Sequence, residues 1–341
     1  MKQLPTDCKK QKDVTNHHRL RNLFLPQFFL LLFSFALLGS HPASADTQLT
    51  WTQQTSGTHK GETYLGATWG HDQFIVVGRA NYSGAKNTAP SPILTSSDGI
   101  TWTRQTSGTQ NSLFGVTWGN GQYIAVGDSG TILTSPDGVT WTAQSSGTQQ
   151  NLFSVTWGDS LYVAVGGGPD IILTSPDGIT WTDRSLNTGY GFVTVIRENG
   201  LFLAGGDLAN SINTSPDGKT WSQHIFAGAQ AYYGIAWNGS TFAAAGISGS
   251  GTGTTSTIAT SSDGLNWTAQ PTLGSYSLRG LTWSGTQFVA VGQYGNIFIS
   301  TDGTNWTHQT YVASDALIAV TSSTTQIVAV GAAHIILTAA P

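Results

Sequence analysis

The chain has 341 residues, of which 14 are Lys or Arg and 18 are Asp or Glu, so charged residues make up only 9% of it. The small number of charged residues and the slight excess of acidic ones argue against nucleic acid and anionic membrane surfaces as partners. The single cysteine, Cys8, leaves no cysteine pair from which a disulfide framework could be built.

The first 45 residues differ in composition from the rest. Basic residues such as Lys9 and Arg21 precede a largely apolar run at 23–39, and the small residues Ala43-Ser44-Ala45 follow it. This order predicts a secretory signal peptide that is cleaved between Ala45 and Asp46. An uncleaved membrane anchor is the alternative, at the lower limit of length for a span. Six basic and two acidic residues lie in 1–45, so the domain predicted at 46–341 carries a net charge of −8. We expect it to be secreted or periplasmic, monomeric and not inserted in a membrane.

A repeat follows, most clearly at 113–141 (LFGVTWGNGQYIAVGDSGTILTSPDGVTW) and again at 152–181. Each copy contains four strand-length runs rich in Val, Ile, Thr and aromatic residues, bounded by Gly, Asn, Asp or Pro. The Ser-Pro-Asp-Gly step between the last two runs is typical of a tight hairpin turn. Each copy therefore predicts a four-stranded antiparallel meander, and stacked copies would bury the faces of the sheets.

The number and phase of the repeats predict how the chain closes. A Val-Gly-like strand end occurs seven times and the hairpin Trp also seven times, but the two series are out of phase. The chain opens with an orphan last strand from Leu49 and ends without one. We predict an all-β, seven-bladed β-propeller of four-stranded antiparallel blades, in which the N-terminal strand completes the last blade.

Two blades are longer than the others, with insertions at 79–91 and 247–257 between their second and third strands. In such a blade these loops share a face with the connections between blades, and the Asp-Gly hairpins lie on the other face. We expect the insert-bearing face to carry the function.

The hairpin motif Ser-Pro-Asp-Gly-Val-Thr-Trp at 135–141 resembles the Asp-box (BNR) repeat. With the Val-Gly and Ile-Leu-Thr-Ser strands, the chain is similar to the photosystem II assembly/stability factor group of WD40/YVTN/BNR-like propellers. The resemblance implies the fold and a scaffold role, including that of an assembly factor for an envelope or membrane complex. One residue fewer separates Asp from Trp than in the usual box, and the arginine triad of sialidases is not recognisable. The Asp and Trp residues of the boxes are Asp98, Trp102, Asp137, Trp141, Asp177, Trp181, Asp217, Trp221, Asp263, Trp267, Asp302 and Trp306.

The box aspartates could ligate calcium, but their separation around a ring favours turn capping instead. No His or Cys spacing indicates a metal site, and we expect no cofactor.

A variable column in the first strand of each blade is more informative. It reads Leu65, Phe114, Phe153, Val193, Tyr233, Arg279 and Ile318, whereas the column two residues later is uniformly apolar. Aromatic residues with a few polar groups are typical of saccharide and peptide sites. Ordinary loop packing is the alternative. The candidate ligand-binding residues are Tyr64, Phe114, Phe153, Tyr190, Tyr232, Tyr233, Tyr276, Arg279, Tyr294, Asp128 and Asp207.

Two classes of function remain open at this point. The first is an exported, non-enzymatic scaffold that binds a protein or a glycan on the insert-bearing face. The second is a glycan-active hydrolase or lyase that uses Asp128, Asp207 and a nearby Tyr, which would require the two carboxylates to lie about 5–10 Å apart. No catalytic constellation is recognisable, so we favour the first.

Overall fold

The computed structural model describes residues 48–55, 61–80, 89–168, 170–186, 189, 191–207 (without the side chain of Asp207), 211–226, 228–249, 253–309 and 314–341. The predicted signal peptide and its cleavage site at Ala45–Asp46 lie outside these residues. The regular structure in the described part consists of short strands and three single-turn 3₁₀ helices, which are η1 (Asp128–Gly130), η3 (Gln293–Gly295) and η4 (Ala332–His334).

The strands pair into seven four-stranded antiparallel sheets, the blades of a β-propeller. Blade one contains β2 (Thr63–Gly70), β3 (Gln73–Arg79), β4 (Pro92–Ser96) and β5 (Thr103–Thr106). Blades two and three contain β6 (Leu113–Gly119), β7 (Gln122–Gly127), β8 (Ile132–Ser135) and β9 (Thr142–Gln144), then β10 (Leu152–Gly158), β11 (Leu161–Gly166), β12 (Ile172–Ser175) and β13 (Thr182–Asp183). Blades four and five contain β14 (Gly191–Glu198), β15 (Leu201–Asp207), β16 (Ser211–Ser215) and β17 (Ser222–Ile225), then β18 (Ala231–Trp237), β19 (Phe242–Ser248), β20 (Thr255–Ser261) and β21 (Thr268–Ala269). Blades six and seven contain β22 (Leu278–Trp283), β23 (Phe288–Gly292), β24 (Ile297–Ser300) and β25 (Thr307–Gln309), then β26 (Leu317–Ser322), β27 (Ile327–Gly331), β28 (Ile336–Ala339) and β1 (Thr52–Gln53).

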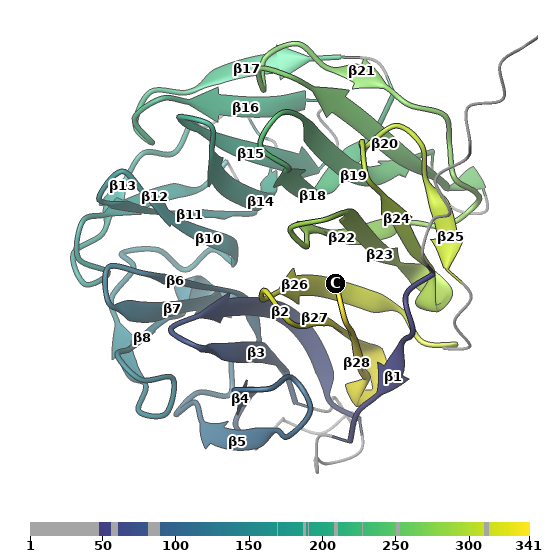
Figure 1. Ribbon diagram of the computed structural model, residues 1–341. Coiled ribbons are helices and arrows are strands. Elements are labelled where there is room, and N and C mark those ends of the chain that lie inside the picture. The colour runs from purple at the N-terminus through teal and green to yellow at the C-terminus, as the bar shows by residue number, and fades with distance from the viewer. Residues whose placement is uncertain are drawn as a thin grey trace, which may run out of the picture. The chain divides into compact units, whose positions relative to one another are not determined.

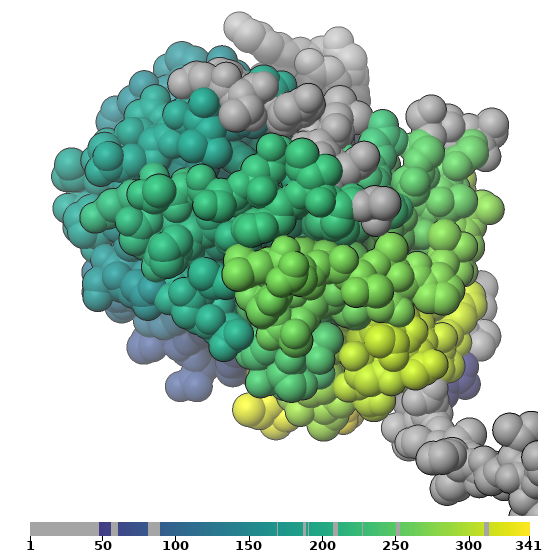
Figure 2. Space-filling model, turned by 90° about the horizontal axis from the view of Figure 1, so that it is seen from above, coloured from purple at the N-terminus to yellow at the C-terminus, as the bar shows by residue number. Residues whose placement is uncertain are grey.

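The blades form a closed ring (Figure 1). Their inner strands surround a central channel, which contains a cavity lined by residues of all seven blades. The first strand of each blade lies innermost and packs against the first strands of both neighbours, including β2 against β26 at the junction of blades one and seven. Seen from the rim, neighbouring blades follow one another in chain order and are packed side by side (Figure 2). The predicted all-β, seven-bladed architecture is confirmed.

The N-terminal strand completes blade seven, as the sequence predicted. Strand β1 pairs antiparallel with β28, and Gln54 Nε2 donates a hydrogen bond to Thr338 Oγ1 at 2.8 Å. In blade two, Gln144 Nε2 donates to Thr134 Oγ1 at 3.0 Å in the same way. The N-terminal strand therefore reproduces the outer-strand contact of an uninterrupted blade.

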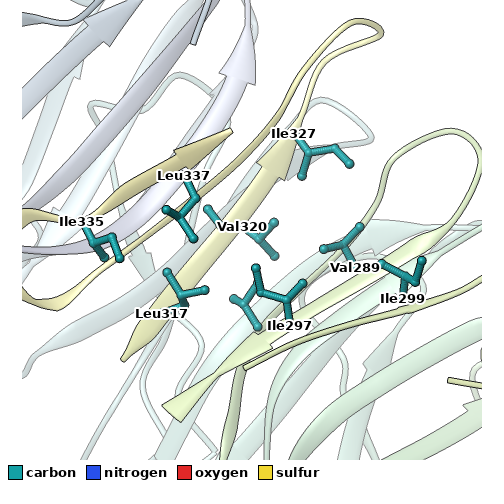
Figure 3. Close-up of a cluster of buried hydrophobic side chains, with 10 residues drawn as sticks. Val289, Ile297, Ile299, Leu317, Val320, Ile327, Ile335 and Leu337 are labelled. Atoms are coloured by element: carbon teal, nitrogen blue, oxygen red, sulfur yellow. The ribbon is translucent and has the colours of Figure 1, made fainter. Parts of the chain in front are cut away.

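Apolar side chains fill the space between adjacent blades, so the core consists of separate clusters, one at each interface. At the interface of blades six and seven, Val289 and Ile299 of one sheet face Leu317 and Leu337 of the other (Figure 3). These four side chains are at most 1% exposed. Burial between sheets explains why most second strands, such as β7 and β27, read as almost continuous apolar runs.

A tryptophan at the end of the inner strand fixes the spacing of neighbouring blades. Trp118 packs on Tyr123 of its own blade with ring centroids 4.5 Å apart. It also covers Gly70 of blade one so closely that an added Cβ there would lie 2.4 Å from the Cβ of Trp118. Related ring contacts involve Trp69, Trp157, Trp237 and Trp283.

Arg197 takes the tryptophan position in blade four. Its guanidinium lies 5.0 Å from the ring centroid of Phe202, and its side chain covers Gly158 of blade three. It also forms an ion pair with Asp159 of that blade. In blade seven, Ser322 at the same position donates a hydrogen bond to the Trp283 carbonyl at 3.0 Å. Both substitutions thus retain a contact with the preceding blade.

The Asp boxes form the turns between third and fourth strands. Asp137 Oδ1 accepts hydrogen bonds from the backbone N–H groups two and three residues ahead, both at 2.9 Å. Trp141 Nε1 donates to the Gly138 carbonyl at 2.9 Å. These backbone hydrogen bonds lower the pKa of the Asp137 carboxyl below its ordinary value. The same Asp and Trp contacts occur in the boxes of Asp98 and Trp102, Asp177 and Trp181, Asp217 and Trp221, Asp263 and Trp267, and Asp302 and Trp306.

Candidate ligand site at the channel mouth

Every inner strand carries a β-bulge at the same place. In blade one, Tyr64 pairs with Gly78 and Gly66 pairs with Val77, so Leu65 has no partner between them. A bulge inserts one residue into the strand and re-aims its side chain. The bulge residues of the seven blades are Leu65, Phe114, Phe153, Val193, Tyr233, Arg279 and Ile318. They are the variable column of the sequence analysis.

Burial changes sharply at the bulge. All seven bulge residues are half-buried, whereas the residue directly before each of them is at most 2% exposed. Those preceding residues are Tyr64, Leu113, Leu152, Phe192, Tyr232, Leu278 and Leu317. One step along the chain therefore separates a core position from a channel position.

A small residue usually follows the bulge because neighbouring inner strands approach closely there. An added Cβ on Gly66 would lie 2.5 Å from the Phe114 carbonyl oxygen, and one on Gly115 would lie 2.8 Å from the Phe153 carbonyl oxygen. Real Cβ atoms do not tolerate such contacts, so the glycines allow the bulges of adjacent blades to lie side by side.

The seven bulge side chains line a cavity of about 440 Å³ in the channel. This volume falls in the range of small-molecule and peptide pockets. The residues two positions later also line it, below the bulge ring, and most of them are buried as predicted for core positions. Because the bulges lie near the start of the inner strands, the ring is at the end of the channel that opens on the insert-bearing face.

The mouth of the channel has two chemically different sides. Phe114 and Phe153 of blades two and three pack edge to face, with ring centroids 5.2 Å apart. Three blades further round, Arg279 lies over Tyr233 with its guanidinium carbon 4.5 Å from the ring centroid. An apolar aromatic pair thus faces a cationic aromatic pair across the channel.

The other predicted tyrosines are placed differently. Tyr64 and Tyr232 are completely buried between blades, so their side chains do not reach the channel. Burial raises the pKa of the Tyr232 hydroxyl above its ordinary value. Tyr276 is half-buried, stacks on Phe298 with ring centroids 5.6 Å apart and donates to the Leu273 carbonyl at 2.6 Å. It therefore covers the core between blades five and six.

Tyr294 is 67% exposed and has a φ of 57° in η3, which packs against the inner strand β26. Ser129 and Ala333, the central residues of η1 and η4, have the same left-handed conformation, so it belongs to this repeated turn. Asp128 begins η1, and its Oδ2 accepts a hydrogen bond from the Ser112 N–H at 3.3 Å. Tyr190 and the side chain of Asp207 lie outside the described residues.

A second cavity, of about 670 Å³, lies on the outer part of blade two and has no counterpart in the sequence prediction. Its lining is uncharged and mixes polar and apolar groups, with Thr109, Asn111, Thr131 and Thr148 beside the half-buried ring of Trp141. The repeated Ser-Gly-Thr-Gln stretches at 107–110 and 146–149 could have indicated it. We refer to it as the blade-two groove.

Within the described ranges, no group of three or more His, Cys, Asp or Glu side chains is placed to hold a metal ion. The same residues contain no helix long and apolar enough to cross a membrane.

No protein-family model matches this sequence, and no curated protein does. Among solved structures, the chain is similar to YCF48 from Cyanidioschyzon merolae, with a TM-score of 0.64 and 16% identity over 85% of this chain and 98% of that one. YCF48 bound to D1 peptide gives a TM-score of 0.66 at 16% identity, over 88% and 97%. Virginiamycin B lyase from Staphylococcus aureus gives 0.71 at 11% identity, over 86% and 100%. Identities this low show the fold alone. The chain is thus a seven-bladed propeller, a fold that it shares with YCF48.

Proposed function

We propose that this chain is an exported, non-enzymatic scaffold that binds a segment of a partner protein at the channel mouth. The observation that carries the proposal is the ring of bulges, because it presents seven variable side chains on a frame whose core positions are uniformly apolar. YCF48, which shares the fold, has been solved with a peptide bound. Export is inferred from the signal-like sequence at 1–45.

Selection from a peptide display library against residues 46–341 tests this proposal. Peptides that bind the channel mouth should lose about tenfold or more in affinity for the variants Phe114→Ala and Tyr233→Ala, because aromatic anchors dominate such interfaces. Both side chains are only half-buried, so thermal unfolding should confirm that the variants remain folded.

Val139→Ala is a matched control, since Val139 is 50% exposed in an Asp-box turn on the opposite face. Selected peptides should bind this variant as they bind the wild type. Equal binding to all three variants would place the ligand elsewhere and contradict the proposal.

A glycan is the second candidate, favoured by the blade-two groove. Hydroxyl and amide groups beside a tryptophan are suited to a neutral saccharide. Binding of the mature protein to a glycan array that includes peptidoglycan fragments tests this candidate. A hit that persists in Tyr233→Ala and is lost in Asn111→Ala would assign the groove as the glycan site. A blank array from folded protein would count against a glycan.

A further inference from the structure

Arg279 is the only charged side chain among the described residues that line the cavity of about 440 Å³. It is half-buried, and its guanidinium carbon lies 4.5 Å from the centroid of the Tyr233 ring. No described carboxylate lies within 4 Å of it, in contrast to Arg104 with Glu62 and Arg197 with Asp159. A partly desolvated cation without a counter-charge lowers the cost of binding an anion.

The stacking on Tyr233 favours a planar anion. A guanidinium that lies over an aromatic ring uses its face for that contact, and its N–H groups point outward in its plane. Those N–H groups make no hydrogen bond to a described residue. Two parallel N–H donors match the two oxygens of a carboxylate.

The rest of the cavity indicates what the anion is attached to. Phe114 and Phe153 face Arg279 from across the channel, and Leu65 and Ile318 complete an apolar wall beside them. The cavity of about 440 Å³ has room for an aromatic or branched aliphatic group between these residues and the guanidinium.

We propose that the channel mouth binds a carboxylate next to an aromatic or branched aliphatic group, with Arg279 as its counter-charge. This carboxylate site adds detail to the proposed function and rests on it, because the carboxylate is the group by which a partner segment would be recognised. The same chemistry is found in a free organic acid and in the last residue of a polypeptide.

Titration calorimetry with two small probes tests the carboxylate. N-acetylphenylalanine should bind the mature protein, and N-acetylphenylalaninamide, which differs only at the carboxyl group, should bind at least about tenfold more weakly. Arg279→Met should remove this difference, and Arg279→Lys should restore only part of it, because an ammonium lacks the planar pair of donors. Lys219→Met, which removes an exposed charge in the Asp box of blade four, is the control for net charge and should behave as the wild type.

Equal binding of acid and amide, no binding of either probe, or an unchanged preference in Arg279→Met would overturn the proposal. A dipeptide ending in phenylalanine separates the two sources. Tighter binding than N-acetylphenylalanine points to a chain terminus, and weaker binding points to a free acid. If selected peptides need Phe114 and Tyr233 but bind Arg279→Met unchanged, the carboxylate is wrong and the proposed function stands. If they need none of these residues, both fail.

Discussion

Arg197 shows how one residue keeps a repeat intact after a substitution that looks disruptive. Five blades have Trp at this position. In all five the Trp packs on an aromatic ring of its own blade, and in blades two and three it also covers a glycine of the preceding blade. Arg197 does both with its aliphatic stem and guanidinium, and adds an ion pair to Asp159. The partner residue lies in another blade, so no alignment of the repeats could have identified it.

Replacing Arg197 should therefore test packing more than charge. We expect Arg197→Ala to lower the free energy of unfolding by about 1–3 kcal/mol, because it leaves the space in front of Gly158 empty. Arg197→Trp should cost less than about 1.5 kcal/mol, since it restores the residue of the other blades. Urea unfolding measures both values. Asp159→Asn is the control and should cost less than about 1 kcal/mol, because Asp159 is 53% exposed. A neutral Arg197→Ala would contradict this role.

Trp51 and Trp141 differ in the hydrogen bonding of a single atom, the indole nitrogen Nε1. Its ring packs against the core of blade seven, but its Nε1 is buried without a partner among the described residues, whereas Trp141 Nε1 donates to a backbone carbonyl. We expect Trp141→Phe to cost about 1 kcal/mol more than Trp51→Phe, since only the former loses a hydrogen bond. Comparable losses in urea unfolding would show that Trp51 has a partner in solution.

At the scale of the element, the Asp box depends on one carboxylate that binds two backbone N–H groups. These bonds lower the pKa of Asp98, Asp137, Asp177 and Asp217 below the ordinary value. The box therefore stabilises its hairpin more strongly when the aspartate is ionised.

Low pH should weaken the Asp boxes of the wild type but not boxes in which the aspartate is replaced by asparagine. Because the folded-state pKa lies below the unfolded one of about 3.9, the stabilisation is fully present above that value and is lost as the pH falls through the folded-state pKa. We expect the difference in unfolding free energy between the wild type and Asp137→Asn/Asp177→Asn to be constant above about pH 5 and to change below about pH 4. Urea unfolding from pH 7 to pH 2.5 measures it, and parallel curves throughout would contradict it.

Turn and strand signals were sufficient to predict the fold because they are local. Ser-Pro-Asp-Gly defines a hairpin without knowledge of the other blades, and the out-of-phase Trp and Val-Gly series predicted the closure by β1. The bulges were harder to predict from the sequence, because a bulge breaks the two-residue period on which strand predictions rest. Hence Tyr233 was assigned with Tyr232, although one lies in the channel and the other in the core.

At the scale of the whole molecule, the ring has one seam. The turn that would join β28 to β1 is missing, and a cavity of about 500 Å³ lies there, bordered by Leu49, Gln287 and Pro341. Leu49 N–H bridges to blade six by donating to Gln309 Oε1 at 2.8 Å. The ring is therefore held at the seam by strand pairing, side-chain packing and a few hydrogen bonds.

Removal of residues 46–55 should open this seam. The deletion leaves β28 as an exposed edge and empties the place of Trp51, so we expect a loss of at least about 3 kcal/mol and a clear fall in Tm. A synthetic peptide of residues 46–55 should restore the Tm in a concentration-dependent manner, because it binds only the folded ring. A scrambled peptide is the control. An unchanged Tm after the deletion would show that β1 does not hold the ring together.

The bulges also have a consequence for how such a protein can change over generations. Selection can alter any of the seven channel side chains while the buried residue beside it, and with it the stability of the blade, stays the same. Recognition and folding are thus encoded at neighbouring but separate positions. Proteins with this ring can therefore change their ligand through a series of single substitutions, and the protein remains folded after each one.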